Sequence, residues 1–166
     1  MIKRTLTALL YGTAGGVVTL VLVAAIHLHN RLDLELWHEA HLDAEFRVDS
    51  PVSDLKGYLA LEERLFQQLE RRVLDRLPPS EQGPLNRYQR GSLTDPGRWK
   101  RNWNRTFELD APGPAAGVLL LHGMSDAPYS LRAIATDLND KGAWVLGLRL
   151  PGHGTAPSGL VRVTWE

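Results

Sequence analysis

The sequence of 166 residues contains no cysteine. This absence excludes disulfides, thiolate metal sites and a cysteine nucleophile. Net charge is absent as well, because 19 lysine and arginine residues balance 19 aspartate and glutamate residues. This balance gives no electrostatic reason to expect nucleic acid or a strongly acidic partner. Internal repeats and low-complexity tracts are also missing from the sequence, which argues against a repeat architecture.

A charge-free segment near the N-terminus predicts a helix that spans a membrane. Residues 5–26 are 22 consecutive residues without an acidic or basic side chain, and about 20 apolar helical residues cross the hydrocarbon core of a bilayer. Lys3 and Arg4 precede the segment, whereas acidic residues closely follow Arg31. The excess of positive charge on the N-terminal side predicts a cytoplasmic N-terminus and a remainder on the outer or periplasmic side.

The same segment has a second interpretation as a cleaved signal peptide, with residues 23–25 (Val-Ala-Ala) as a small-residue cleavage site. The apolar run is longer than the ~7–15 residues of a typical signal sequence. We therefore favour an uncleaved anchor over residues 1–30, with the lipid bilayer as its partner. Gly12 and Gly16 have a spacing that lets helices pack closely. Because such spacings often arise by chance, a homodimer through the membrane helix is a minor hypothesis.

Residues 31–104 are predicted to form a helical and loop linker. In its first part, residues 31–48, charged side chains alternate with leucines and aromatics, which indicates an amphipathic helix or an extended arm near the membrane. His38 and His41 would share one face of a helix, but no carboxylate or cysteine pattern completes a metal ligand set. We therefore interpret them as solvated side chains, and we expect no metal and no cofactor.

A longer amphipathic helix is predicted to begin at Ser50 or Ser53. Its apolar residues recur at three- and four-residue steps as far as Leu77, where two prolines follow after about seven turns. Charged residues, Glu62 among them, are assigned to the opposite face. The helix would pack on the next domain, or act as a lid or a spacer. The loops over residues 78–104 mix cations with aromatics, as single-stranded nucleic-acid sites do, but zero net charge and the anchor favour a structural arm.

The last third of the chain predicts a β-α-β unit. Residues 106–109 form a short strand, and residues 118–121 are a continuous apolar run that indicates a strand buried on both faces. A helix over residues 128–138 follows, and Gly142 stands where the end of a helix needs a left-handed residue. Residues 143–148 form the next buried strand. Strand, helix and strand within about thirty residues predict parallel strands joined by a right-handed crossover.

Two motifs follow the two predicted parallel strands. Residues 119–125 read Leu-Leu-Leu-His-Gly-Met-Ser, and residues 148–154 read Leu-Arg-Leu-Pro-Gly-His-Gly, with Trp165 further on. Together they resemble the α/β-hydrolase superfamily, in particular its branch of lysophospholipases, monoacylglycerol lipases and serine aminopeptidases. The resemblance covers residues 106–166. It implies an α/β fold, the incomplete N-terminal half of a doubly wound α/β-hydrolase sheet, with the truncated domain starting at residue 105 after the anchor and the linker.

The resemblance also implies a function and a set of roles. The parent protein would be a serine hydrolase for an ester, lysophospholipid, monoacylglycerol or peptide substrate. The His-Gly turn would supply one backbone N–H of the oxyanion hole, here that of Met124, and losing such a donor costs ~10²–10³ in rate. Gly123 would let the backbone approach closely. His122 would support the turn rather than act as a base, and His153 is expected to be structural.

Ser125 is the alternative nucleophile, because residues 123–127 come one residue short of Gly-x-Ser-x-Gly between a strand and a helix. Ser125, Asp137 or Asp140, and His153 even occur in the family's order. They span only 29 residues, too few to reach three loops of a doubly wound sheet, so Ser125 is the weak candidate. The nucleophile elbow is expected beyond this sequence.

Two hypotheses about function follow from the sequence. In the first, the chain is the N-terminal fragment of a membrane-anchored serine hydrolase, inactive alone and poorly soluble because the edge of its sheet is open. In the second, the chain is a non-catalytic, membrane-tethered interaction module derived from half of a hydrolase.

Overall fold

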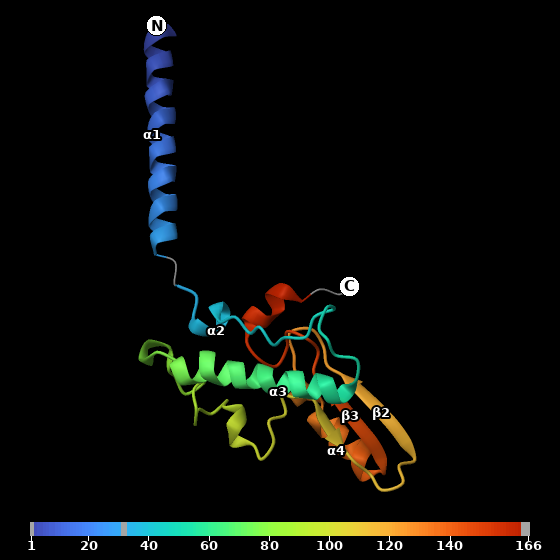
Figure 1. The fold of residues 1–166 in the computed structure, drawn as a ribbon. Coiled ribbons are helices and arrows are strands. Elements are labelled where there is room, and N and C mark those ends of the chain that lie inside the picture. Colours follow the sequence, from blue (N-terminus) through green and yellow to red (C-terminus); the bar gives the residue numbers. More distant parts are fainter. Residues whose placement is uncertain (1, 31–32, 164–166) are drawn as a thin grey trace. The chain divides into compact units, whose positions relative to one another are not determined.

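The computed structural model describes residues 2–30 and 33–163 (Figure 1). The chain divides into two compact units, Met1–Leu34 and Glu35–Glu166. The second unit therefore takes in most of residues 31–104 as well as the β-α-β region. Trp165, which belongs to the family resemblance, lies outside the described residues.

The first unit is the helix α1, Ile2–His29. Its stretch Lys3–His29 is long and apolar enough to cross a membrane, by length and composition, and none of it is buried inside the protein. The hydroxyls of Thr7, Thr13 and Thr19 donate hydrogen bonds to carbonyls four residues earlier, for example from Thr13 to Leu9 at 2.8 Å. This pattern removes the need for water to satisfy them. The predicted N-terminal helix is confirmed.

The second unit begins with irregular chain and one short helix, α2 (Leu36–Glu39). The remainder of residues 33–48 forms turns and extended segments, so of the two predicted alternatives, an amphipathic helix or an extended arm, the structure shows the extended arm. Four residues cannot nucleate a stable helix by themselves. The arm is instead held by tertiary contacts, which bury Ala40 and Leu42.

The long helix α3 spans Leu55–Arg72, and Asp54 caps it by accepting a 2.7 Å hydrogen bond from the N–H of Gly57. The prediction of a helix that reaches Leu77 is therefore too long, and neither predicted serine is the cap. Val73 leaves helical geometry with φ −121° and ψ −65° while its side chain is fully buried. Packing of Val73 thus ends α3 before the prolines do, and a single 3₁₀ turn, η1 (Leu74–Arg76), follows.

The segment after α3 contains no regular helix or strand, as predicted for residues 78–104. It carries two 3₁₀ turns, η2 (Pro79–Glu81) and η3 (Pro96–Arg98). Aromatic residues attach it to the rest of the unit, because the Tyr88 ring is buried and Trp103 packs edge-to-face on Phe107 with ring centroids 5.0 Å apart.

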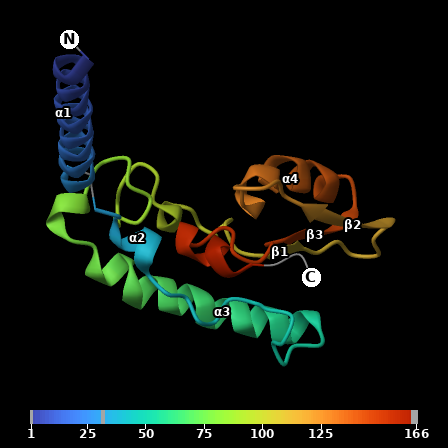
Figure 2. The same cartoon turned by 90° about the horizontal axis from the view of Figure 1, so that it is seen from above.

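A small mixed sheet of three strands follows, formed by β1 (Phe107–Leu109), β2 (Ala116–Leu121) and β3 (Ala143–Leu148) in the order β1-β3-β2 (Figure 2). β1 runs antiparallel to β3. β2 runs parallel to β3, with Val118 opposite Val145. The chain passes from β2 to β3 through a 3₁₀ turn, η4 (Pro128–Leu131), and the helix α4 (Arg132–Asp140). The predicted parallel strand-helix-strand unit is confirmed, and Gly142 has the expected positive φ, 89°.

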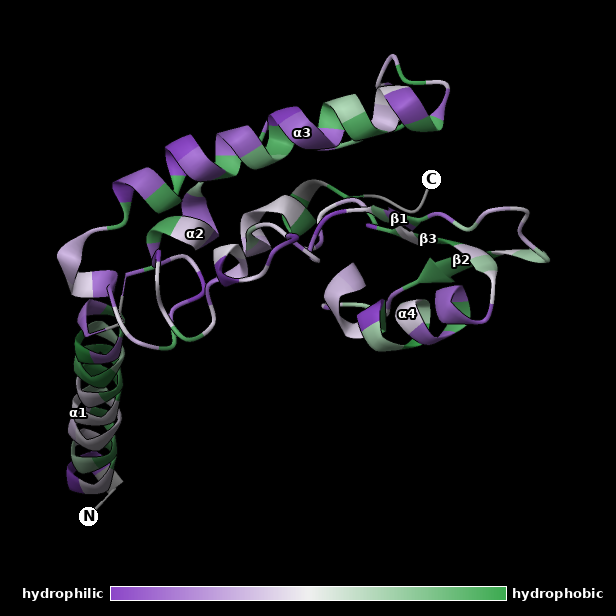
Figure 3. Cartoon of the chain, turned by 90° about the horizontal axis from the view of Figure 1, so that it is seen from below, coloured by the Kyte–Doolittle hydropathy of each residue, from purple (hydrophilic) through white to green (hydrophobic). Residues whose placement is uncertain are grey.

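The prediction that β2 is buried on both faces is wrong. Leu119 and Leu121 are 57% and 54% exposed, whereas Val118 and Leu120 pack in the cluster that includes the fully buried Ala135 of α4. The cause is topological, because β2 is an edge strand and α4 packs on the face that carries Val118 and Leu120. Figure 3 shows the apolar character of the strands.

Two hydrophobic clusters organise the second unit. The first joins the arm, α3 and the segments around Tyr88 and Ala156, and its buried members are Ala40, Leu42, Leu65, Phe66, Leu69, Val73, Tyr88 and Ala156. The second lies between the sheet and α4, and its buried members are Phe107, Ala135, Ala143 and Val145. A late segment of the chain, around Ala156, thus completes the core of the arm and α3. Figures 1 and 2 show the last 3₁₀ turn, η5 (Pro157–Arg162), beside α2.

Candidate functional site

The turn after β2 is held by a buried histidine. His122 is 5% exposed, and its Nε2 accepts a 3.0 Å hydrogen bond from the backbone N–H of Leu150, in the loop after β3. Because Nε2 accepts, Nδ1 carries the proton and donates to the carbonyl of Gly123 at 2.9 Å. Burial lowers the pKa of His122, with the nearby His153 acting in the same direction. The neutral ring thus uses both nitrogens to join two loops.

The next two residues present backbone donors. In the part of the chain that the structure describes, the N–H of Met124 has no hydrogen-bond partner, and its side chain is 91% exposed. Ser125 has φ +60°, a left-handed conformation that no other described non-glycine residue adopts. Such a conformation costs ~1–3 kcal/mol and persists only where its surroundings impose it. The turn therefore leaves a donor without a partner among the described residues at the carboxyl end of β2, where a parallel sheet binds its ligands.

The neighbouring Asp126 organises the start of the following helix. Its carboxylate accepts hydrogen bonds from the N–H of Ala127 at 2.7 Å and from the hydroxyl of Ser130 at 2.6 Å. The Ser130 hydrogen bond lowers the pKa of Asp126, and the bond from Ala127 acts in the same direction. Asp126 therefore stays ionised, and its role is to hold the turn to η4.

The alternative Ser-Asp-His set is only partly brought together. Ser125 and His153 line the same pocket, but no hydrogen bond joins them among the described residues. His153 donates from Nδ1 to the carbonyl of Pro151 at 2.8 Å, and its buried Nε2 has no partner among the described residues. Asp137 instead pairs with Lys141 on the exposed side of α4, at 2.7 Å.

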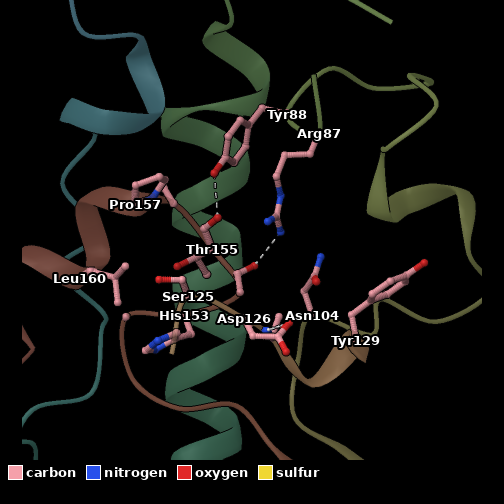
Figure 4. Close-up of a pocket in the computed structure, with 14 residues that line it drawn as sticks. Arg87, Tyr88, Asn104, Ser125, Asp126, Tyr129, His153, Thr155, Pro157 and Leu160 are labelled. Carbon is pink, nitrogen blue, oxygen red and sulfur yellow. Dashed lines mark hydrogen bonds between the residues drawn. The ribbon is translucent and has the colours of Figure 1, made fainter. Parts of the chain in front are cut away.

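This pocket has a volume of about 390 Å³. Figure 4 shows Ser125, Asp126 and His153, from the loops after β2 and β3, below Arg87 and Tyr88, with Asn104 beside Asp126. Arg87 donates to the carbonyl of Gly154 at 3.4 Å, and the Tyr88 hydroxyl donates to the carbonyl of Thr155 at 3.0 Å. Residues 78–104, which were predicted to be a structural arm, therefore also form a wall of the pocket.

A buried ion cluster lies behind these loops. The guanidinium of Arg149 is 1% exposed and contacts Glu45 twice, Nη2–Oε1 at 2.8 Å and Nη1–Oε2 at 3.2 Å. Its Nε donates to Glu62 at 2.9 Å. Although burial opposes the charged form, the Glu45 carboxylate raises the pKa of Arg149 above its ordinary value. The cluster thus joins the arm, α3 and the end of β3 through one charged side chain.

Arg149 also holds the loop after β3. Its Nη1 donates to the carbonyl of Leu150 at 3.3 Å and to that of His153 at 3.0 Å. Its own carbonyl accepts a 2.6 Å hydrogen bond from the hydroxyl of Tyr58, and burial raises the pKa of Tyr58 to about 12. Because the N–H of Leu150 bonds to His122, a continuous set of hydrogen bonds runs from the ion cluster to the turn that carries the donor.

The burial of the two carboxylates of this cluster, Glu45 and Glu62, was not predicted from the sequence. Glu62 was assigned to the polar face of the helix, which is wrong, because it is 3% exposed. The N–H and hydroxyl of Thr106 both donate to it. One signal was present, since Glu62 stands three residues before Leu65 and four before Phe66 and therefore shares their buried stripe. Glu45 lies in irregular chain and has no such signal.

His38 and His41, which were predicted to share one helix face, belong to no metal-ligand cluster among the described residues. In residues 2–30 and 33–163, no group of three or more histidine, aspartate or glutamate side chains is placed to hold a metal ion. The Nδ1 of His38 lies 2.8 Å from the carboxylate of Glu35.

In comparisons with known proteins, no protein-family model matches this sequence, and no curated protein matches it either.

Proposed function

We propose that the chain is the N-terminal part of a membrane-anchored serine hydrolase of the α/β-hydrolase superfamily, which acts on the carbonyl of an ester, lipid or peptide. The backbone N–H of Met124 is one donor of its oxyanion hole. The observation that carries the proposal is the Met124 N–H, which has no partner among the described residues, at the carboxyl end of β2 in a turn clamped by His122.

Three features support this assignment. A donor that stabilises a developing oxyanion must be oriented before the reaction, so that no energy is spent on reorganisation. His122 supplies that rigidity by bonding both to Gly123 and to Leu150. Arg149 and its carboxylates hold the second loop from behind. The strand-helix-strand connection is the scaffold on which the resemblance expects these two motifs.

The test removes the backbone N–H of residue 124 and compares the result with a variant that changes only the side chain. An amide-to-ester replacement at residue 124, or Met124→Pro, deletes the donor, and Met124→Ala keeps it as the matched control. Activity is measured on the complete product of the encoding gene, with activated esters and a serine-directed phosphonate probe. Loss of the donor should lower kcat by ~10²–10³, whereas Met124→Ala should stay close to wild type because that side chain is 91% exposed.

Two results would contradict the proposal. One is undiminished activity in the ester variant. The other is a gene product that reacts with no serine-directed probe and has no Gly-x-Ser-x-Gly motif about 60 residues further on, a spacing that assumes two units of ~30 residues each. The second result would favour the membrane-tethered interaction module.

We further propose that α1 is an uncleaved anchor with its N-terminus in the cytoplasm and the second unit on the outer or periplasmic side. The length and composition of Lys3–His29 support an anchor, and the basic residues that precede the apolar run support the orientation. Because the chain has no cysteine, Val161→Cys gives a single label site that is 81% exposed. A membrane-impermeant maleimide should label it in intact cells or spheroplasts. Labelling only after lysis would reverse the orientation, and a mature chain that begins near residue 26 would refute the anchor.

A further inference from the structure

The loop that carries Arg87 and Tyr88 also exposes large apolar side chains. Leu85 is 72% exposed, Leu93 is 66% exposed and Trp99 is 51% exposed. Two hydrogen bonds bring the two leucines together, from the N–H of Leu93 to the carbonyl of Pro84 at 2.9 Å and from the hydroxyl of Thr94 to the carbonyl of Leu85 at 2.8 Å. Leu93 and Trp99 also line one pocket of about 310 Å³. Single exposed leucines are ordinary, but these three residues are grouped by contacts within the same loop.

The same loop carries positive charge without matching acids. Residues 84–101, which we call the basic loop, contain five cations and one acidic residue. The acid, Asp95, is used within the loop, where it accepts hydrogen bonds from Gly91 and Gly97 at 2.7 Å. Arg90 pairs with two acids outside the loop. Three exposed cations have no carboxylate partner in the described parts of the chain, and these are Arg98, Lys100 and Arg101.

The start of the second unit is docked next to this loop. The N–H of Leu36 donates to the carboxylate of Glu81 at 3.1 and 3.3 Å, and the ring of Trp37 stacks on Tyr88 with centroids 5.0 Å apart. Leu36 follows the last residue of α1, His29, by only seven residues. Seven residues of fully extended chain span at most ~25 Å. In an anchored chain, this short tether keeps the docked segment close to the lipid surface.

We propose that the basic loop is a second membrane contact that binds the anionic lipid surface of the bilayer crossed by α1. Its leucines would enter the boundary between headgroups and acyl chains, Trp99 would lie at headgroup level, and the three cations without a carboxylate partner would meet the lipid phosphates. The two arginines among these cations would give up weak contacts with backbone carbonyls to do so. The proposal rests on α1 being an anchor. A single strand of nucleic acid is the rival ligand, because aromatics and cations serve it equally. The tether favours lipid, since it keeps a bilayer permanently within reach.

The test uses the full chain reconstituted in lipid nanodiscs. Because the chain has no cysteine, Leu93→Cys carries a single environment-sensitive fluorophore, and Val48→Cys, 75% exposed outside the loop, is the matched control. In nanodiscs rich in phosphatidylglycerol, the label at residue 93 should emit at shorter wavelength and resist an aqueous quencher, and it should do so less in phosphatidylcholine alone. The label at residue 48 should stay aqueous in both lipids.

Charge reversal tests the electrostatic part of the proposal. Each cation at an anionic leaflet is worth a factor of about five in binding, so changing Arg98, Lys100 and Arg101 together to glutamate should weaken insertion by more than a hundredfold and return the label to water. The matched triple variant reverses three exposed cations of α3, Lys56, Arg64 and Arg71, and should leave insertion unchanged. Circular-dichroism melts confirm that both triple variants remain folded.

The possible outcomes distinguish a failure of the α1 anchor from a failure of the lipid contact proposed for the basic loop. Failure of the chain to co-elute with nanodiscs overturns the anchor and this proposal together. Co-elution with an aqueous label at residue 93 overturns only the proposal, as does insertion that survives reversal of the loop's three cations. A label that responds to a single-stranded oligonucleotide and not to anionic lipid would assign the loop to nucleic acid instead.

Discussion

Replacing Arg149 with methionine is expected to unfold much of the second unit. The guanidinium is 1% exposed and neutralises two carboxylates, Glu45 and Glu62, which are 6% and 3% exposed. Arg149→Met preserves the length and apolar stem of the side chain but leaves both carboxylates buried without a cation. Removing one partner of a buried ion pair costs ~3–5 kcal/mol, a large fraction of the ~5–15 kcal/mol that stabilises a typical domain.

The assay is urea denaturation of the full chain in mild detergent, followed by tryptophan fluorescence. All five tryptophans lie after residue 34, so the signal reports the second unit and not α1. With a urea m-value of ~2 kcal/mol/M, the loss should lower the midpoint by at least ~1.5 M. Arg71→Met, an exposed arginine of α3, is the control and should change stability by less than ~0.5 kcal/mol.

Two further variants test the ion cluster even if Arg149→Met is too unstable to measure. Arg149→Lys retains the charge and loses the fork that contacts Glu45 twice, so its midpoint should fall between those of wild type and Arg149→Met. Adding Glu45→Gln to Arg149→Met should restore stability, because it removes one unpaired buried charge. An Arg149→Met midpoint equal to that of Arg71→Met, or a double variant less stable than Arg149→Met, would refute the ion-cluster account.

Two other predictions use the same fluorescence assay. Burial holds the pKa of His122 below its ordinary 6.5. Just below pH 6.5 the folded state therefore binds fewer protons than the unfolded chain. The stability that neutral His122 contributes is complete above pH 6.5 and is lost as the pH falls through the lowered pKa. His122→Gln should reduce this loss, and an unchanged pH profile would contradict it. Gly142 and Gly154 both have positive φ, but an added Cβ meets nothing at Gly142 and lies 2.5 Å from the Asn104 carbonyl oxygen at Gly154. Gly142→Ala should cost ~1–2 kcal/mol and Gly154→Ala clearly more, whereas equal costs would show that the close approach is relieved by movement.

Local patterns predicted the elements that depend on a few adjacent residues. The apolar run before residue 27 predicted α1, and alternation of strand and helix signals predicted β2, α4 and β3 with their parallel pairing. The left-handed position of Gly142 was also readable, because a helix end requires it. The residue at which α3 ends could not be predicted from local patterns, since it depends on the burial of Val73 against residues distant in sequence.

The candidate site divides in the same way. The resemblance to the α/β-hydrolase superfamily pointed to His122, Gly123 and Met124, because the motifs that carry the resemblance are runs of adjacent residues. Only the tertiary structure decided that His122 bonds to Leu150, 28 residues away, and that Arg149 meets Glu45, 104 residues away. Hydrophobic period and turn chemistry act between near neighbours in the chain, whereas burying a charge depends on which distant segment brings a partner, and no local pattern encodes that pairing.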